Sequence, residues 1–124
     1  MFNAKIERLA FAIKIAEGWL PDENSLTYRN HNPGALRSSK FALGARDNFA
    51  YFLSDDIGFA ALCYDIAMKC QGKTVTKLGP NSTLYDLIKV YTAETNPEKL
   101  ENYTLIVEHI TGISRNVKLR NFNI

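Results

Sequence analysis

The sequence predicts an α+β domain that is predominantly helical. Apolar residues recur with helical spacing in four separate segments, and strand-favouring residues gather only between the first and second of these. The chain has 124 residues, of which 46% are hydrophobic and 23% charged, as in an ordinary globular protein. We therefore expect one domain over residues 1–124, with four main helices and a small strand region or hairpin between the first two.

The first helix is expected to run from about Ala4 to Glu17, with Asn3 as its N-cap. Glu17 lies on the apolar stripe of this helix, together with Ile6, Leu9, Ala10 and Ile13. Loss of solvent and the negative end of the helix dipole would both raise the pKa of its carboxyl group. Gly18 can end the helix in the left-handed conformation. Glu17 is thus a candidate general acid, and a solvated glutamate at a helix end is the alternative.

A turn rich in asparagine follows, over residues 28–37. Pro33 favours an extended backbone at Asn32, and Gly34 permits a positive φ. Such a turn displays amides that can bind N-acetyl groups of sugars, but purely structural turns use the same residues. In residues 38–53, the apolar segments 41–44 and 49–52 bracket a polar tip at 45–48 and predict short strands or a hairpin.

Three further helices are marked by their first residues. Ser54 is the expected N-cap of a helix over about 55–70, which is apolar nearly all round and so belongs in the middle of the domain. Thr83 and Asp86 form a capping-box variant that opens the next helix. Asn96 and Pro97 open the last long helix, which is expected to stop at Gly112.

The remaining residues, about 114–124, form a basic, polar tail. It offers little to bury, so we expect a solvated terminus, with an arm that binds an anionic polymer as the alternative.

Composition narrows the classes of function. A net charge of +2 without a dense basic run gives no sign of nucleic-acid binding. No apolar run is long enough to cross a membrane, and the charged N-terminal residues do not resemble a secretory signal. Cys63 and Cys70 lie two helical turns apart, beyond disulfide reach, so we expect reduced core thiols in a chain made in the cytoplasm. Two histidines and no Cys-His spacing predict neither a metal site nor a cofactor.

Several motifs, in this order, resemble the lysozyme-like lytic transglycosylase domains of phages and bacteria. They are Ala-Glu-Gly at residues 16–18, Asn-His-Asn-Pro-Gly-Ala-Leu-Arg at 30–37, Phe-Ala-Tyr-Phe at 49–52 and Gly-Phe-Ala-Ala-Leu at 58–62. The resemblance extends through Thr83, Tyr91, Asn96 and Tyr103, so it covers roughly residues 13–112. The chain departs from the family pattern at His31 and Ala35, where the family usually has asparagine.

The resemblance implies a lysozyme-like fold and cleavage of the β-1,4 bond between N-acetylmuramic acid and N-acetylglucosamine in peptidoglycan. Glu17 would be the catalytic acid, and closure of a 1,6-anhydro ring would need no second carboxylate. Tyr28 and Asn32 match substrate-facing positions, and Tyr91 either faces the cleft or is a core tyrosine with its hydroxyl at the edge. His31 is expected to be a turn residue rather than a base.

The main alternative is a hydrolase of the lysozyme type. Unlike the transglycosylase, a hydrolase would need a second carboxylate. Leu26 stands where phage-type lysozymes have an aspartate, which favours the transglycosylase. Asp22 and Glu23, five and six residues after Glu17, would have a different geometry, and Asp47 is a remote candidate for the missing group.

Two other classes remain open, namely a non-catalytic wall-binding or structural module and a small helical interaction domain. We expect a monomer whose partners are glycan strands. With no signal, it would reach the cell wall through a lysis, virion or secretion route.

Overall fold

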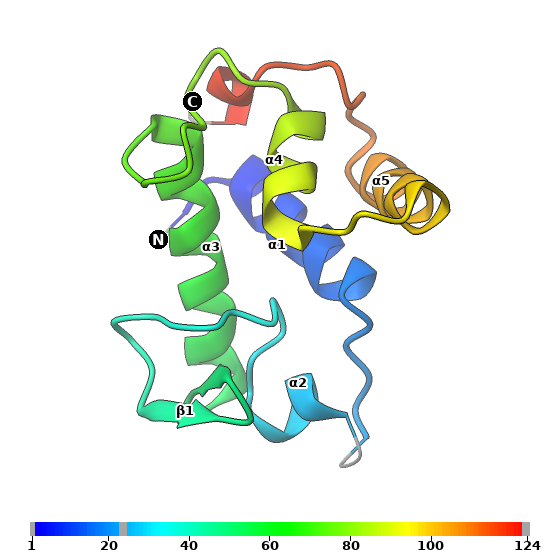
Figure 1. The fold of residues 1–124 in the computed structure, drawn as a ribbon. Coiled ribbons are helices and arrows are strands. Elements are labelled where there is room, and N and C mark those ends of the chain that lie inside the picture. Colours follow the sequence, from blue (N-terminus) through cyan, green and yellow to red (C-terminus); the bar gives the residue numbers. More distant parts are fainter. Residues whose placement is uncertain (1, 23–24, 123–124) are drawn as a thin grey trace.

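Helices dominate the computed structural model, which describes residues 2–22 and 25–122 (Figure 1). Two short antiparallel strands form a hairpin between α2 and α3, which confirms a predominantly helical α+β chain with a small strand region. The elements in this part of the chain are α1 (Ala4–Ala16), α2 (Leu26–Arg29), β1 (Gly44–Arg46), β2 (Phe49–Tyr51), α3 (Asp55–Gln71), α4 (Leu84–Thr92), α5 (Pro97–Thr111) and a 3-10 helix, η1 (Leu119–Phe122).

The four long helices begin at the predicted caps. The Asn3 side chain accepts a hydrogen bond from the Ile6 amide at 2.8 Å, and Ser54 caps α3 in the same way. Thr83 and Asp86 form the reciprocal capping box of α4. Asn96 caps α5, with Pro97 in its first turn. These local signals placed the helix starts correctly because each satisfies amide groups that the first turn leaves without partners.

The core has two clusters that share α3, which runs along one side of the molecule (Figure 1). The larger cluster joins α1, α3, α4, α5 and η1. The smaller one packs Ala61 of α3 against the loop and hairpin residues Leu36, Ala50 and Phe52. α3 therefore contributes side chains to both clusters. Fully buried members of the larger cluster include Leu9, Ile13, Leu62, Ile66, Leu84, Ile88 and Val107.

The hairpin forms, but its strands are offset from the prediction. Arg46 pairs with Phe49, and Asp47 and Asn48 both have positive φ, as in a two-residue type I′ turn. β1 starts at Gly44, so Ala45 and Arg46 belong to the strand and not to the tip. The apolar residues 41–43 were predicted to belong to the strand. In the structure, a turn at 39–42 precedes the strand instead.

The conformation of the asparagine-rich turn also differs from the prediction. His31 and Ala35, rather than Gly34, have positive φ, at 51° and 52°. Gly34 is needed for space, because a Cβ there would lie 2.6 Å from both Leu62 Cδ1 and the Tyr91 hydroxyl oxygen. The single-turn helix α2 was not predicted, since four residues carry no periodic pattern.

Gly58 brings α3 against the same turn. A Cβ at this position would lie 1.8 Å from the carbonyl oxygen of His31, and neither backbone could yield that much. The His31 ring also contacts Asp55, with Nδ1 2.8 Å from the carboxylate oxygen. Both contacts hold the turn in place at the start of α3, and His31 is a turn residue as predicted.

The predicted solvated tail is wrong for residues 114–122, and residues 123–124 of that prediction lie outside the described residues. Residues 114–122 fold back onto the core, and we call them the C-terminal clasp. Leu119 and Phe122 are fully buried, and the Phe122 carbonyl accepts a hydrogen bond from the Asn3 side chain at 2.8 Å. The two apolar side chains stand one helical turn apart among polar residues, too sparsely for the pattern to show that both face inward.

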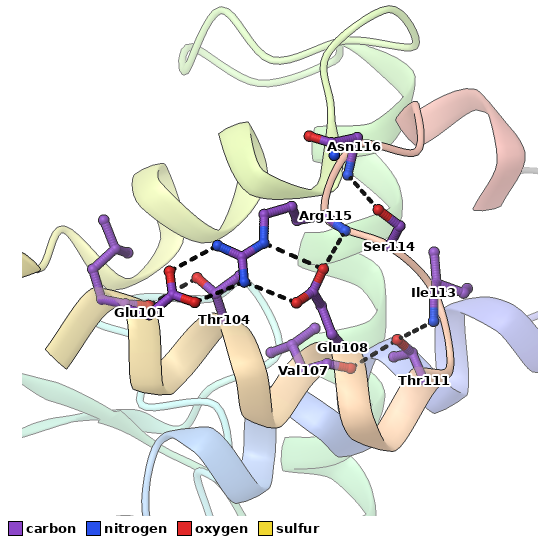
Figure 2. A network of polar contacts seen from close by, with 10 residues as sticks. Glu101, Thr104, Val107, Glu108, Thr111, Ile113, Ser114, Arg115 and Asn116 are labelled. Carbon is purple, nitrogen blue, oxygen red and sulfur yellow. Dashed lines mark hydrogen bonds and ion pairs between the residues drawn. The ribbon is translucent and has the colours of Figure 1, made fainter. Parts of the chain in front are cut away.

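Arg115 anchors the clasp to α5 (Figure 2). Its guanidinium makes two hydrogen bonds to Glu101, at 2.8 and 2.9 Å, and two to Glu108, at 2.9 and 3.2 Å. Its backbone carbonyl accepts from the Tyr85 amide, which ties the clasp to α4 as well. The hydrogen bonds from Arg115, and to a smaller extent its positive charge, lower the pKa of both carboxyl groups.

The two cysteines are free and buried, as expected of core thiols. Burial raises the pKa of each thiol to about 12, so both stay protonated at neutral pH.

Candidate active site

Glu17 stands at the end of α1, where the helix gives way to a loop. It is the C-cap residue, its amide bonds to the Ile13 carbonyl at 2.8 Å, and Gly18 follows with φ +81°. The predicted helix end and left-handed glycine are therefore confirmed. The side chain is partly buried, and its Oε2 accepts a hydrogen bond from the Tyr103 hydroxyl of α5 at 2.8 Å.

Two effects act on the Glu17 carboxyl group in opposite directions. Burial raises its pKa, and the hydrogen bond from Tyr103 lowers it because that bond stabilises the ionised form. Burial is the larger effect, so the pKa lies above the ordinary value for glutamate. The direction predicted from the sequence is confirmed. A carboxyl group of this kind keeps its proton closer to neutral pH and can donate it.

Three adjoining cavities meet at Glu17. The first, which we call the amide cavity, has a volume of about 320 Å³ and lies toward α2; the second, the arginine cavity, has about 440 Å³ and lies toward α4. A third of about 330 Å³ lies between Glu17 and α5. Ala35 and Phe49 line both of the first two. The amide cavity is completed by Gly18, Ser25, Leu26, Thr27, Asn30 and Asn32; the arginine cavity includes Leu36, Arg37, Asp65, Lys69, Thr76 and Tyr91.

Asn32 lines the amide cavity, but its amide mainly holds the turn together. Nδ2 donates to the carbonyls of Leu36 and Ala50, at 2.8 and 2.9 Å, and Oδ1 accepts from the Leu36 amide at 2.9 Å. The residue is 1% exposed. Both amide hydrogens are therefore in use, and direct binding of a sugar is left to the second lone pair of Oδ1. The structural interpretation of this asparagine is the better supported one.

Asn30 also lines the amide cavity and was not among the predicted site residues. It is 2% exposed, and its Nδ2 has no hydrogen-bond partner among the described residues. A buried amide without a partner is costly, and in a cavity wall it is a candidate for binding a ligand. The sequence signal was present in the Asn-x-Asn spacing, but only the fold shows which amide is already satisfied.

Tyr28 lies against Trp19, with ring centroids 5.7 Å apart in an edge-on arrangement. Neither ring is among the residues that line the three cavities. The predicted substrate contact of Tyr28 is thus not supported by these cavities, and its ring instead packs against Trp19 in the loop that follows Glu17.

Tyr91 combines the two alternatives that the sequence left open. Its hydroxyl donates to the Gly34 carbonyl at 2.5 Å, so it fastens the turn to α4, and it also lines the arginine cavity. Burial raises the pKa of its hydroxyl well above the ordinary value, and the nearby carboxylates of Asp65 and Glu17 raise it further.

Carboxylates other than Glu17 are sparse in the cavities. Asp65 lines the arginine cavity but pairs with Lys69 at 2.5 Å, and Glu94 lines the third cavity but accepts from two backbone amides. Leu26, which the resemblance matches to the aspartate of phage-type lysozymes, lines the amide cavity. Asp22 and Asp47 line none of the three, and Glu23 lies outside the described residues.

The described residues show no cluster of three or more His, Cys, Asp or Glu side chains that could hold a metal ion. In the same part of the chain, no helix is both long and apolar enough to span a bilayer.

Comparison of the chain with protein-family models, with curated proteins and with solved structures gives no match.

Proposed function

We propose that this protein is a peptidoglycan-cleaving glycosidase, a lytic transglycosylase with Glu17 as its single catalytic carboxyl group. The observation that carries the proposal is the position of Glu17, a partly buried carboxyl group with a raised pKa where three cavities meet. A glycan strand could extend from the cleaved bond in both directions. The lysozyme-like fold is part of this proposal, supported by the order of the motifs.

In the proposed reaction, Glu17 first donates a proton and then accepts one. The protonated carboxyl group donates its proton to the oxygen of the β-1,4 bond as the bond to C1 of the muramoyl unit breaks. The resulting carboxylate then accepts the proton of the C6 hydroxyl of the same sugar while that oxygen bonds to C1. The products are a 1,6-anhydromuramoyl end and a free 4-hydroxyl, with no net use of water.

A lysozyme-type hydrolase is the second candidate, and Asp65 is the observation in its favour. Asp65 lines the same cavity as Glu17 and could hold a water molecule. Its ion pair with Lys69 and the leucine at position 26 both favour the transglycosylase.

Zymography on purified peptidoglycan tests whether Glu17 is catalytic. We expect clearing by the wild type and a loss of about 10²–10⁴-fold in rate for Glu17→Gln, the range that general acids contribute. Asp65→Asn and Glu94→Gln are the matched controls and should keep most of the activity.

Strong loss in Asp65→Asn would favour the hydrolase. Binding to peptidoglycan without clearing would identify a wall-binding module, and no binding at all would favour an interaction domain. Since the substrate lies outside the cytoplasmic membrane, the active protein would need a lysis, virion or secretion route to reach it.

A further inference from the structure

Two of the cavities beside Glu17, the amide cavity and the arginine cavity, differ in charge. Apart from Glu17, the amide cavity is lined by no charged side chain among the described residues. Apart from Glu17, the charged side chains that line the arginine cavity are Arg37, Lys69 and Asp65. Lys69 is already neutralised, because its Nζ lies 2.5 Å from the Asp65 carboxylate. Arg37 is therefore the cation that gives the arginine cavity its positive charge.

Arg37 is free to bind an anion. Its side chain is exposed, and within residues 2–22 and 25–122 no carboxylate pairs with it. Its guanidinium instead lies over the ring of Phe49, 4.7 Å from the centroid. Stacking fixes the plane of a guanidinium while its N–H groups remain available at the edge, so less conformational entropy is lost when it binds a planar anion.

We propose that Arg37 binds a carboxylate carried by the muramoyl unit of the substrate. This inference rests on the proposed function, in which the substrate alternates between a neutral and a carboxylate-bearing sugar. The muramoyl unit would then lie on the arginine-cavity side of Glu17, and the neutral N-acetylglucosamine unit on the amide-cavity side. Phe49 lines both cavities and offers an apolar surface to the sugars at their junction.

The carboxylate has two possible sources. In a peptide-free strand it is the lactyl group of N-acetylmuramic acid, whereas in intact peptidoglycan that group is amide-linked and the stem peptide supplies the free carboxylates. Both present the same planar anion to a guanidinium, which can bind it through two parallel hydrogen bonds.

The test measures binding of three tetrasaccharides to two proteins: the Glu17→Gln variant, and the double variant that carries both Glu17→Gln and Arg37→Gln. The three are a neutral N-acetylglucosamine tetramer, a peptide-free tetramer of alternating muramoyl and glucosaminyl units, and the same tetramer bearing stem peptides. We expect Arg37→Gln to weaken binding of one or both anionic tetramers by about 10–100-fold, the range for a charge-assisted hydrogen bond, and to leave the neutral tetramer unchanged.

Arg46→Gln is the matched control. Arg46 also lies over an aromatic ring, 4.2 Å from the centroid of Tyr51, but it lines none of the cavities that contain Glu17. Loss with the peptide-free tetramer identifies the lactyl group, and loss confined to the peptide-bearing one identifies the stem. Affinity for the preferred anionic tetramer should fall with added salt, and this dependence should weaken in Arg37→Gln.

Equal weakening for neutral and anionic tetramers, or none for any, would overturn the role of Arg37, provided that thermal unfolding shows each variant to be folded. Failure of the proposed function is distinguishable from this. If the wild type cuts no peptidoglycan while carboxylate binding still depends on Arg37, the enzyme proposal fails and the binding proposal stands. If no tetramer binds at all, both fail.

Discussion

At the scale of single residues, two opposing effects set the pKa of Glu17: burial raises it and one hydrogen bond lowers it. Tyr103 reaches Glu17 from α5, a helix that begins eighty residues later in the chain, and its hydroxyl stabilises the ionised carboxylate. The sequence indicated the burial of Glu17 from the spacing of α1, but gave no sign of this partner. Helical periodicity reports which face of a helix is buried and not which side chain meets it.

Replacement of Tyr103 by phenylalanine should raise the pKa of Glu17 further. The ring is kept, and only the donor that favours the ionised carboxylate is lost. Activity requires the protonated acid, so the fall in rate on the alkaline side should move to higher pH. A pH profile of peptidoglycan clearing measures this; an alkaline limb at lower pH would contradict the proposed electrostatics.

Glu17 should also cost the protein stability near neutral pH. Its native pKa is raised, so the unfolded chain loses this proton first as pH rises, and ionisation then favours unfolding. This cost is absent when the pH is below the pKa of Glu17 in the unfolded chain, and it is complete when the pH is above the pKa of Glu17 in the native protein. Urea unfolding should therefore show Glu17→Gln to be stabilising at pH 7 and much less so at pH 3. A gain of the same size at both pH values would mean that the carboxyl group is not desolvated.

At the scale of elements, α4 ends in a strained conformation. Its C-cap residue, Ala93, has φ +51°, in the left-handed region that favours glycine. The same strain occurs at Ala35, with φ +52°, where the family that this chain resembles usually has asparagine, a residue that tolerates this conformation better.

Ala93→Gly should stabilise the chain by about 1 kcal/mol, because glycine adopts the left-handed conformation without the steric cost of a Cβ. Ala60→Gly is the control: Ala60 is exposed within α3, and the same change there should destabilise by about 1 kcal/mol. Thermal unfolding of both variants decides the question, and equal signs for the two changes would contradict the assignment of strain at Ala93.

The long helices were the most predictable elements, because a cap or a left-handed glycine needs only neighbours along the chain. Asn3, Ser54 and Gly112 were all assigned correctly on that basis. The role of Gly34 was not, since its need for space comes from Leu62 and Tyr91, far away in the sequence. Asn32 was predicted as a substrate contact and Asn30 was not, because only the positions of the Leu36 and Ala50 carbonyls show that the Asn32 amide is already bonded.

At the scale of the whole molecule, the C-terminal clasp closes the helical part. It connects α4 and α5 through Arg115 and reaches the start of α1 through Phe122. The prediction of a solvated tail was wrong because the segment was judged to have little to bury, whereas Leu119 and Phe122 are fully buried. In the fold, the guanidinium of Arg115 meets two carboxylates that stand seven residues apart on one face of α5 (Figure 2).

Arg115→Gln should loosen the clasp and lower the melting temperature by a few degrees at neutral pH. Arg115 holds the pKa of Glu101 and Glu108 below the ordinary value. The two carboxylates therefore stabilise the folded protein when the pH is above their pKa in the unfolded chain, and this stabilisation is lost as the pH falls through their pKa in the native protein. The deficit of the variant should therefore shrink in acid. Hydrogen exchange should also quicken at the Tyr85 amide, which bonds to the Arg115 carbonyl.

Arg120→Gln is the control for this experiment, because Arg120 lies in the same clasp and contacts Asn81 rather than a carboxylate. A deficit in Arg115→Gln that does not change with pH, or one matched by Arg120→Gln, would contradict the electrostatic role of Arg115.

The most direct test of the central claim is the chemistry of the new sugar ends. Purified peptidoglycan is digested with the wild type and with Glu17→Gln, and the released fragments are weighed by mass spectrometry. We predict that the wild type releases fragments ending in 1,6-anhydromuramic acid, each one water lighter than a hydrolytic product, and that Glu17→Gln releases almost none. Reducing ends in their place, or equal yields from the two proteins, would contradict the account.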